Sequence, residues 1–297
     1  MQKKAWMTTA HIGNASVYIE EEHGRMCDRM NWSVRLVGIL KKGFLLRFFI
    51  ARLTRAPLLG RIMDSLFFKD DGIIYLATDR IITIDKAVAP ESMVLPSNVV
   101  EHFIEKAAYH WIMNFCICRD AATCKDYPIE LGCLFMGEAA MKINPELGRK
   151  VTKEEALEHV KKCREAGLIH LIGRNKLDTV WLNVGPGNKL LTVCNCCPCC
   201  CLWRMLPDLA PGIGGKVTKM PGVAMTVSDA CMGCGTCEKV CFVNAITVTD
   251  GRAQISEECR GCGRCVDVCP QHAIKVTVEG DFVERSIDFI SDLVDIT

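Results

Sequence analysis

Several common sequence features are missing from this chain. No apolar run approaches the ~20 residues that a membrane-spanning helix needs, so we expect no spanning segment. The first 30 residues lack the apolar core of a secretory signal and are interrupted by Glu20, Glu21 and Glu22. We therefore expect a cytoplasmic protein, soluble or peripheral at the membrane. The formal net charge is only +1, which gives no argument for nucleic acid as a partner.

The signatures of common enzyme sites are missing as well. No GxGxxG follows an expected strand, and the glycine-rich segment 212–216 lacks the spacing and the Ser/Thr of a phosphate-binding loop. The sequence contains neither an HExxH motif nor a recognisable Ser/His/Asp arrangement. We therefore predict no nucleotide cofactor site, and any reaction would depend on a bound metal centre.

Cysteine, in contrast, is abundant, with 20 residues in the chain. Most of these cysteines stand in dense strings, whereas disulfides usually cross-link distant segments. Adjacent cysteines such as Cys196 and Cys197 fit disulfide geometry poorly. Metal-bound thiolates in a reducing compartment explain this distribution better.

The last third of the chain contains an internal repeat. Residues 231–246 and 259–274 match at nine of sixteen positions, and each copy contains the motif CxxCxxCxxxC. Three evenly spaced cysteines allow a tight loop to wrap one iron–sulfur cluster, while the fourth cysteine faces the other cluster. Tetra-cysteine zinc sites rarely use this spacing. The repeat therefore predicts two clusters that carry single electrons.

These two motifs resemble the bacterial two-[4Fe–4S] ferredoxins over about residues 223–280. The resemblance implies two [4Fe–4S] clusters that exchange their fourth ligands. One cluster would take Cys231, Cys234, Cys237 and Cys269, and the other would take Cys259, Cys262, Cys265 and Cys241. Pro270 matches the Cys-Pro of the family, whereas Phe242 stands where proline is usual.

Ten further cysteines form two strings in the middle of the chain. They are Cys116, Cys118, Cys124, Cys133, Cys194, Cys196, Cys197, Cys199, Cys200 and Cys201. So many thiolates in an interior would repel one another unless a metal neutralised them. We predict that both strings serve a third metal site that holds a further Fe–S cluster. Zinc in the first string, or structural free thiols, are the alternatives.

The density of paired cysteines is similar to that in the cysteine-rich domains of heterodisulfide-reductase-like enzymes, which hold noncubane clusters. Those domains contain Cys-Cys-Gly, whereas Pro198 and Leu202 follow the pairs in this chain. The whole chain also resembles uncharacterised cysteine-rich iron–sulfur proteins of strict anaerobes. Neither resemblance implies a particular reaction.

Local patterns predict the elements that present these cysteines. We expect two short helices over 31–69, one of which has 44–53 as its middle and is ended by Pro57, and a strand or hairpin over 72–84. A helix capped by Asn98 and Glu101 should run to residue 115 and lead into the first string. A second helix should span 152–166 with a capping box of Thr152 and Glu155, and a buried strand should precede the second string at 189–193.

Charge is distributed unevenly along the chain. Residues 31–63 contain seven Lys/Arg and no Asp or Glu, whereas residues 223–297 contain six Lys/Arg against twelve Asp/Glu, a net of −6. Residues 41–61 combine six basic side chains with a broad apolar surface. This block could be packed core, a docking face for a partner subunit, or a peripheral contact with anionic lipid.

Together these patterns predict an α+β protein in three parts. Residues 1–70 form a basic amphipathic helical region, 71–222 a mixed α/β cysteine-rich domain, and 223–297 a ferredoxin-like βαβ repeat with a C-terminal helix. The Pro/Gly-rich segment 211–222 is the expected linker. We predict an electron-transfer protein or subunit that works with redox partner proteins. There are two alternatives: an anaerobic reductase whose middle cluster is catalytic, and a thiol-rich metal carrier or assembly protein.

Overall fold

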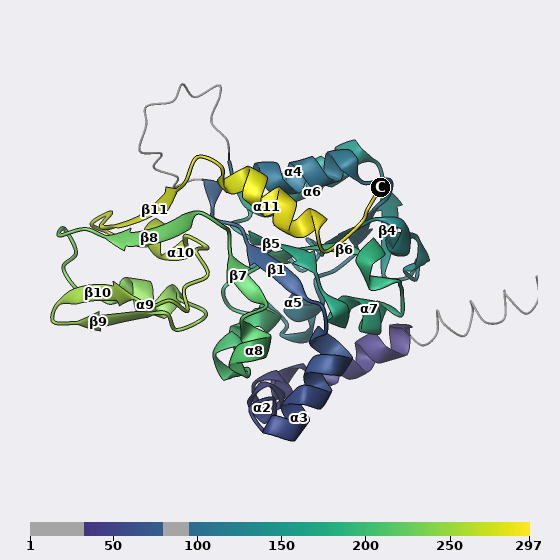
Figure 1. Cartoon of the computed structure of the whole chain (residues 1–297), viewed down its shortest axis with the longest axis horizontal. Helices are drawn as coiled ribbons and strands as arrows, with labels where there is room; N and C mark the ends of the chain where they lie inside the picture. The colour runs from purple at the N-terminus through teal and green to yellow at the C-terminus, as the bar shows by residue number, and fades with distance from the viewer. Residues whose placement is uncertain (1–32, 80–94) are drawn as a thin grey trace, which may run out of the picture.

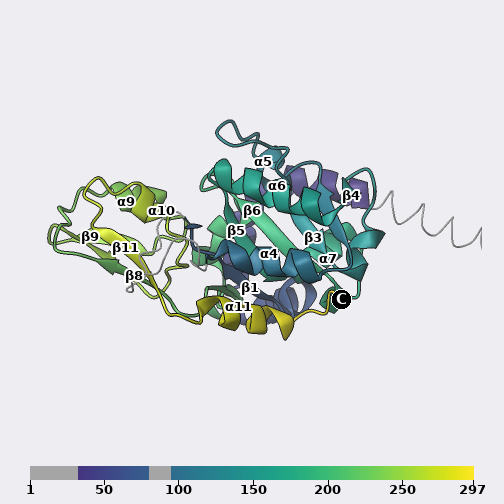
Figure 2. The ribbon, with the colours of Figure 1, turned by 90° about the horizontal axis from the view of Figure 1, so that it is seen from above.

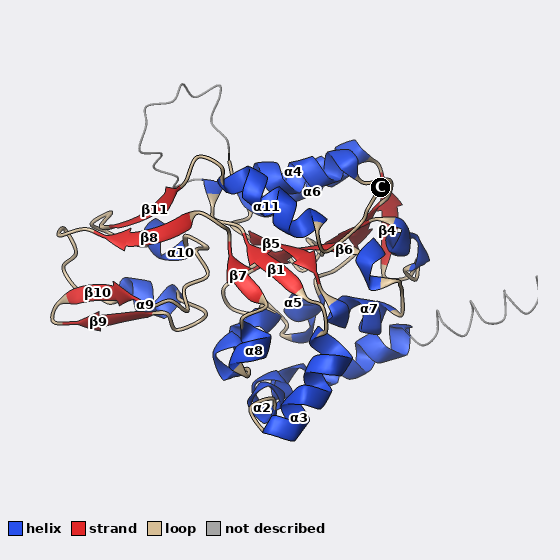
Figure 3. Cartoon of the chain, in the orientation of Figure 1, coloured by secondary structure: helices blue, strands red, loops and turns tan. Residues whose placement is uncertain are grey.

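The computed structural model of the chain describes residues 33–79 and 95–297. A mixed seven-stranded sheet forms the main body, and two small two-stranded sheets form a separate lobe at one end (Figures 1 and 2). Helices surround the large sheet, as the colouring by secondary structure shows (Figure 3). The predicted α+β class is therefore confirmed. Within the described residues, no helix is long and apolar enough to cross a membrane.

The main sheet has the strand order β4-β2-β3-β6-β5-β1-β7. Its strands are β1 (Gly72–Tyr75), β2 (His110–Met113), β3 (Leu134–Met136), β4 (Gly148–Val151), β5 (Ile169–Arg174), β6 (Leu191–Cys196) and β7 (Val217–Lys219). All neighbouring pairs are antiparallel except β1 and β7, which are parallel. β7 falls within 211–222, so the expected linker forms the edge of the main sheet.

Two helical layers cover the sheet. One face packs against α4 (Ser97–Lys106), α6 (Lys153–Glu165) and α11 (Phe282–Ser291), whose apolar side chains share one buried cluster with the strands. The other face packs against α7 (Lys176–Leu182), α8 (Pro211–Gly214) and the 3-10 segment η7 (Leu202–Asp208). Shorter segments are α5 (Ile117–Ala121), η5 (Glu138–Lys142) and η6 (Gly187–Lys189).

The basic block forms a chain of short helices at one side of the body. Residues 33–43 are helical, and η1 (Phe44–Leu46), α2 (Arg47–Leu53), α3 (Pro57–Met63) and the π-helical segment η2 (Asp64–Phe68) follow. α2 packs on η7, where Arg52 forms an ion pair with Asp208 (2.9 Å). Leu45 and Leu58 remain 75% exposed, so the block is only partly packed core.

The C-terminal lobe contains β8 (Val223–Val227), α9 (Thr236–Val240), β9 (Ile246–Thr249), β10 (Arg252–Ile255), α10 (Arg264–Asp267) and β11 (Ile274–Val278). β8 pairs with β11 and β9 pairs with β10, so the two repeat copies form two antiparallel ribbons. After this lobe α11 returns to the main body and packs on α4 and β1.

One predicted helix is wrong in its second half. α4 ends at Lys106, and His110–Met113 form strand β2 between β3 and β4. All four residues of β2 are buried, so an apolar stripe fits a fully covered strand as well as a helix. The predicted cap also differs, because Asn98 accepts a hydrogen bond from the Leu95 amide inside a turn. In the 72–84 segment, β1 ends at Tyr75, and residues 80–84 lie outside the described ranges.

Candidate metal centres

The ends of three strands bring the two middle cysteine strings together. β2 ends just before Cys116, β3 begins just after Cys133, and β6 contains Cys194 and Cys196. Because β3 is antiparallel to both β2 and β6, these three ends lie at the same side of the sheet. The prediction that both strings meet is therefore confirmed, although a strand end rather than a helix end leads into the first string.

The ten cysteines separate into two groups, each with members from both strings. The six-cysteine group contains Cys116, Cys118, Cys133, Cys194, Cys196 and Cys201. Its thiols act on one another's pKa in neighbouring pairs, namely Cys116 with Cys118, Cys133 with Cys194, and Cys194 with Cys196. The Sγ atoms of Cys196 and Cys201 lie 3.1 Å apart. This group lies against the sheet face that packs on η7.

The four-cysteine group contains Cys124, Cys197, Cys199 and Cys200, whose Sγ atoms all lie within 4.8 Å of one another. Cys124 comes from the loop after α5, and the other three come from the turn after β6. The Sγ of Cys199 is 3.6 Å from that of Cys124 and 3.5 Å from that of Cys200. This spacing makes the group a candidate site for a metal ion.

A buried arginine lies between the two strings. Arg119 has no exposed surface, and its guanidinium donates to the carbonyls of Pro128 (2.8 Å), Asn195 (2.7 Å) and Leu131. Burial lowers the pKa of Arg119, but the neighbouring thiolates, Cys116 first among them, outweigh burial and raise it. The guanidinium therefore stays charged, joins the two strings and offsets the negative charge of thiolates.

The electrostatics of the six-cysteine group favour the thiolate form at two positions. Hydrogen bonding by the Cys118 thiol lowers the pKa of Cys116 to about 7, against the effect of burial. Hydrogen bonds from the Cys194 and Cys201 thiols lower the pKa of Cys196, and Arg119 adds to this effect. Neighbouring thiols and burial raise the pKa values of the other four cysteines, so the thiolate, the form that binds metal, is favoured only at Cys116 and Cys196.

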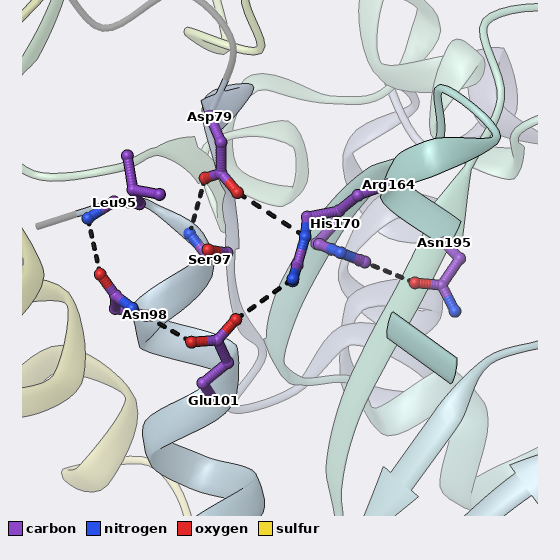
Figure 4. A network of polar contacts seen from close by, with 8 residues as sticks. All are labelled: Asp79, Leu95, Ser97, Asn98, Glu101, Arg164, His170 and Asn195. Carbon is purple, nitrogen blue, oxygen red and sulfur yellow. Dashed lines mark hydrogen bonds and ion pairs between the residues drawn. The ribbon is translucent and has the colours of Figure 1, made fainter. Parts of the chain in front are cut away.

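A polar network on the opposite face of the sheet holds the second string in place (Figure 4). Asn195, between Cys194 and Cys196, donates from Nδ2 to the Gly132 carbonyl (2.7 Å) and accepts at Oδ1 from Nδ1 of His170 (2.7 Å). Burial lowers the pKa of His170 to about 4, so its ring is neutral. These bonds fix the strand whose other face presents the cysteines.

The same network extends to α4 and α6. Arg164 of α6 pairs with Asp79 (3.6 Å) and Glu101 (3.2 Å), while Asp79 also accepts from the Ser97 amide at the start of α4 (3.0 Å) (Figure 4). A cavity beside these groups is lined by Arg164, His170 and also Arg264 of the C-terminal lobe. The polar network therefore reaches the junction between the lobe and the main body.

In the C-terminal lobe, the cysteines assigned by resemblance to the first cluster surround one hollow. Cys231, Cys234, Cys237 and Cys269 all line this hollow. Gly233 has a φ of +66°, and a Cβ there would lie 2.5 Å from the Gly251 carbonyl oxygen, so only glycine fits this loop. That these four cysteines hold one cluster, with Cys269 as the exchanged fourth ligand, stays a prediction.

The second motif is built in the same way. Burial raises the pKa of Cys265, and the Cys262, Cys259 and Cys241 thiolates raise it further. Cys241 therefore lies close to the three cysteines of the second motif. The Ala245 amide donates to the Sγ of Cys241 (3.2 Å), and the Ala273 amide, 28 residues later, donates to the Sγ of Cys269 (3.3 Å). Hydrogen bonds to the sulfurs are among the features that set cluster potentials.

The second motif touches the six-cysteine group directly. Arg264, between Cys262 and Cys265, donates to the Cys196 carbonyl (2.6 Å). The Phe242 ring packs on the Tyr75 ring, with centroids 5.0 Å apart, which explains why a bulky aromatic residue replaces the usual proline. The Tyr75 hydroxyl is buried beside the Cys201 and Cys196 thiols, and burial, followed by these thiols, raises its pKa.

Sequence reasoning missed the residues that join these centres. Tyr75 and Arg264 have no motif of their own, whereas Asn195 could have been noticed as the polar residue inside a cysteine string. Cys163 is fully buried on α6, where burial raises its pKa to about 12, as expected of a packed thiol. Cys27 lies outside the described residues.

Comparison with protein families adds one finding to this geometry. Searches among curated proteins and among solved structures give no match to the chain. Residues 236–279 match the LdpA Fe-S cluster-binding domain, a stretch that includes Cys237, Cys241, Cys259, Cys262, Cys265 and Cys269. The C-terminal lobe therefore contains an iron–sulfur cluster-binding domain.

Proposed function

We propose that this chain is an iron–sulfur electron-transfer protein in which two [4Fe–4S] clusters of the C-terminal lobe communicate with a further iron–sulfur centre in the six-cysteine group. Such clusters, when bound, accept and release single electrons. The chain's own residues supply the ligands, exclude water and fix the distance between the sites. The contact between Arg264 and the Cys196 carbonyl is the observation that supports this proposal most directly.

The two motifs of the lobe differ in their surroundings. Cys234 of the first motif is exposed, whereas the equivalent Cys262 of the second is only partly exposed, and the second motif faces the main body. An external donor would therefore meet the first motif, and the six-cysteine group would lie beyond the second. The net charge of −6 over residues 223–297 suits a basic redox partner.

Two arginines of the second motif provide a matched test. Arg264 contacts the Cys196 carbonyl, whereas Arg260 bonds to Glu258 inside the lobe. In the anaerobically purified full chain, R264M should slow reduction of the middle centre after rapid reduction of the lobe, and R260M should not. Freeze-quench EPR resolves the two stages. Equal rates in both variants, or middle cysteines without any redox-active centre, would refute the proposal.

A reductase remains the second candidate, because two cations lie beside the middle cysteines. Arg47 stacks over the Phe44 and Phe48 rings (4.1 and 4.3 Å) and lies near Arg204 and the Cys118 thiol. A pair of guanidinium groups beside a metal centre would suit a small acidic substrate. If small anions change the EPR signal of the middle centre in wild type but not in R204M, the reductase is favoured.

We also propose that η1, α2 and α3 contact an anionic membrane surface. Leu45, Phe49 and Leu58 are 75%, 62% and 75% exposed, respectively. Residues 31–63 contain no acidic residue to oppose this contact. Exposed apolar side chains among basic ones are typical of interfacial helices. Arg52 and Arg55 bond to Asp208 and Pro207, so they also hold α2 on the body.

A further inference from the structure

Among the described residues, four of the ten middle cysteines form a set in which every Sγ is close to every other, and the remaining six do not. The four-cysteine group is compact, with all Sγ atoms within 4.8 Å of one another. Across the described residues, no three of the eight C-terminal cysteines are this close. A cluster distributes its thiolates over separate irons, so its ligands must stand farther apart than those of a single ion.

The measured separations match one tetrahedral ion. With Zn–S bonds of about 2.3 Å, four tetrahedral sulfurs lie about 3.8 Å from one another. The Sγ of Cys199 is 3.6 Å from that of Cys124 and 3.5 Å from that of Cys200. We infer that Cys124, Cys197, Cys199 and Cys200 bind a single zinc ion, at a site separate from the six-cysteine centre.

The surroundings of the four-cysteine group support a closed structural site. The Cys200 amide donates to the Sγ of Cys197 (3.3 Å), a bond that orients this ligand and offsets its charge. Apolar side chains, including Leu168 and Tyr127, pack around the group, and Cys197 and Cys200 are buried. Four protein ligands leave no open position, which is the arrangement of structural rather than catalytic zinc.

The position of this site explains what the ion would do. Cys124 belongs to the loop between α5 and β3, and the other three ligands belong to the turn between β6 and η7. The ion would therefore cross-link the two loops that also present the six-cysteine group. Zinc does not change its oxidation state, so this site lies outside the electron route and does not depend on the proposed function.

The test uses the full chain, produced and purified anaerobically, with zinc, iron and acid-labile sulfide measured together. We expect about one zinc per chain, with four sulfur ligands at about 2.3 Å by zinc X-ray absorption. C124A and C199A should each lose this zinc and keep their iron and sulfide. C118A, in the six-cysteine group, should lose iron and keep zinc, and the control C163A should keep both.

Several outcomes would overturn the inference. Wild type without zinc, or a zinc with fewer than four sulfur ligands, excludes the site even if the variants fail to fold. Zinc that persists in both C124A and C199A is bound elsewhere. Loss of iron and sulfide from these two variants, with zinc unchanged, would assign the four cysteines to a cluster instead.

Discussion

Replacing Arg119 with lysine should weaken the whole cysteine-rich end of the main sheet. The guanidinium donates to three carbonyls, two in the loop of the first string and one in the second string. A lysine ammonium is a compact donor without the guanidinium fork, so it cannot serve all three directions at once. If it keeps one, two buried carbonyls lose a charged donor. At about 1.5–3 kcal/mol for each such bond, R119K should lower the free energy of unfolding by about 3–6 kcal/mol.

The matched control is R204K, also beside the second string. Within the described part of the chain, Arg204 makes one hydrogen bond, to the Cys199 carbonyl (2.5 Å), which a lysine can retain. We expect R204K to cost less than about 1 kcal/mol, whereas R119K should lower the melting temperature by on the order of 10 °C. Anaerobic thermal unfolding followed by circular dichroism measures both, and bleaching of the iron–sulfur absorbance reports the centre. An R119K curve that overlays those of wild type and R204K would refute the reasoning.

Three other predictions test separate parts of the molecule. C241S should damage the cluster of the second motif and spare that of the first, because Cys241 lies with Cys259, Cys262 and Cys265. Selective loss of the EPR signal of the first-motif cluster would contradict the predicted exchange of fourth ligands. Burial raises the pKa of Asp71 to about 7, so its contribution to stability is present below pH ~4 and is lost as the pH rises through about 7. In D71N the amide oxygen can still accept from the Lys176 amide. At 1.36 kcal/mol per pKa unit, D71N should be more stable than wild type at pH 8 by on the order of 2–4 kcal/mol. Free energies of unfolding that run parallel for the two proteins from pH 4 to 9 would disprove this. The double variant L45E/L58E should no longer cosediment with phosphatidylglycerol vesicles, whereas the control M141E, at a 39% exposed site on η5, should still do so. Equal binding by wild type and both variants, or no binding by wild type, would count against the membrane contact.

Local sequence signals predicted those features that local interactions control. The Thr152 and Glu155 capping box forms as expected at the start of α6, and Gly167 follows its end with a φ of +75°. The strand before the second string also forms, as β6. That the two strings would meet was predicted from their chemistry, since so many thiols would repel one another unless they shared a metal.

Long-range pairing decided what the sequence could not predict. The apolar residues of β2 suit a helix by spacing, but pairing with β3 and β4 makes them a strand. The division of the ten cysteines depends on where the chain turns after β6, because consecutive residues such as Cys200 and Cys201 enter different groups. Tyr75 reaches the centre only because β1 lies beside β5 in the sheet.

The return of α11 to the main body attaches the C-terminal lobe at both ends. β7 precedes the lobe as an edge strand of the main sheet, and after α11 Asp295 bonds to the backbone of Asn188 and to the Lys189 side chain. A lobe attached at one end only could swing, and its electron transfer would then be gated by domain motion. With two attachments, and with Arg264 bound to the Cys196 carbonyl, the distance between the lobe and the body is fixed. If electrons pass from the lobe to the body as proposed, the rate of this transfer should therefore be independent of solvent viscosity.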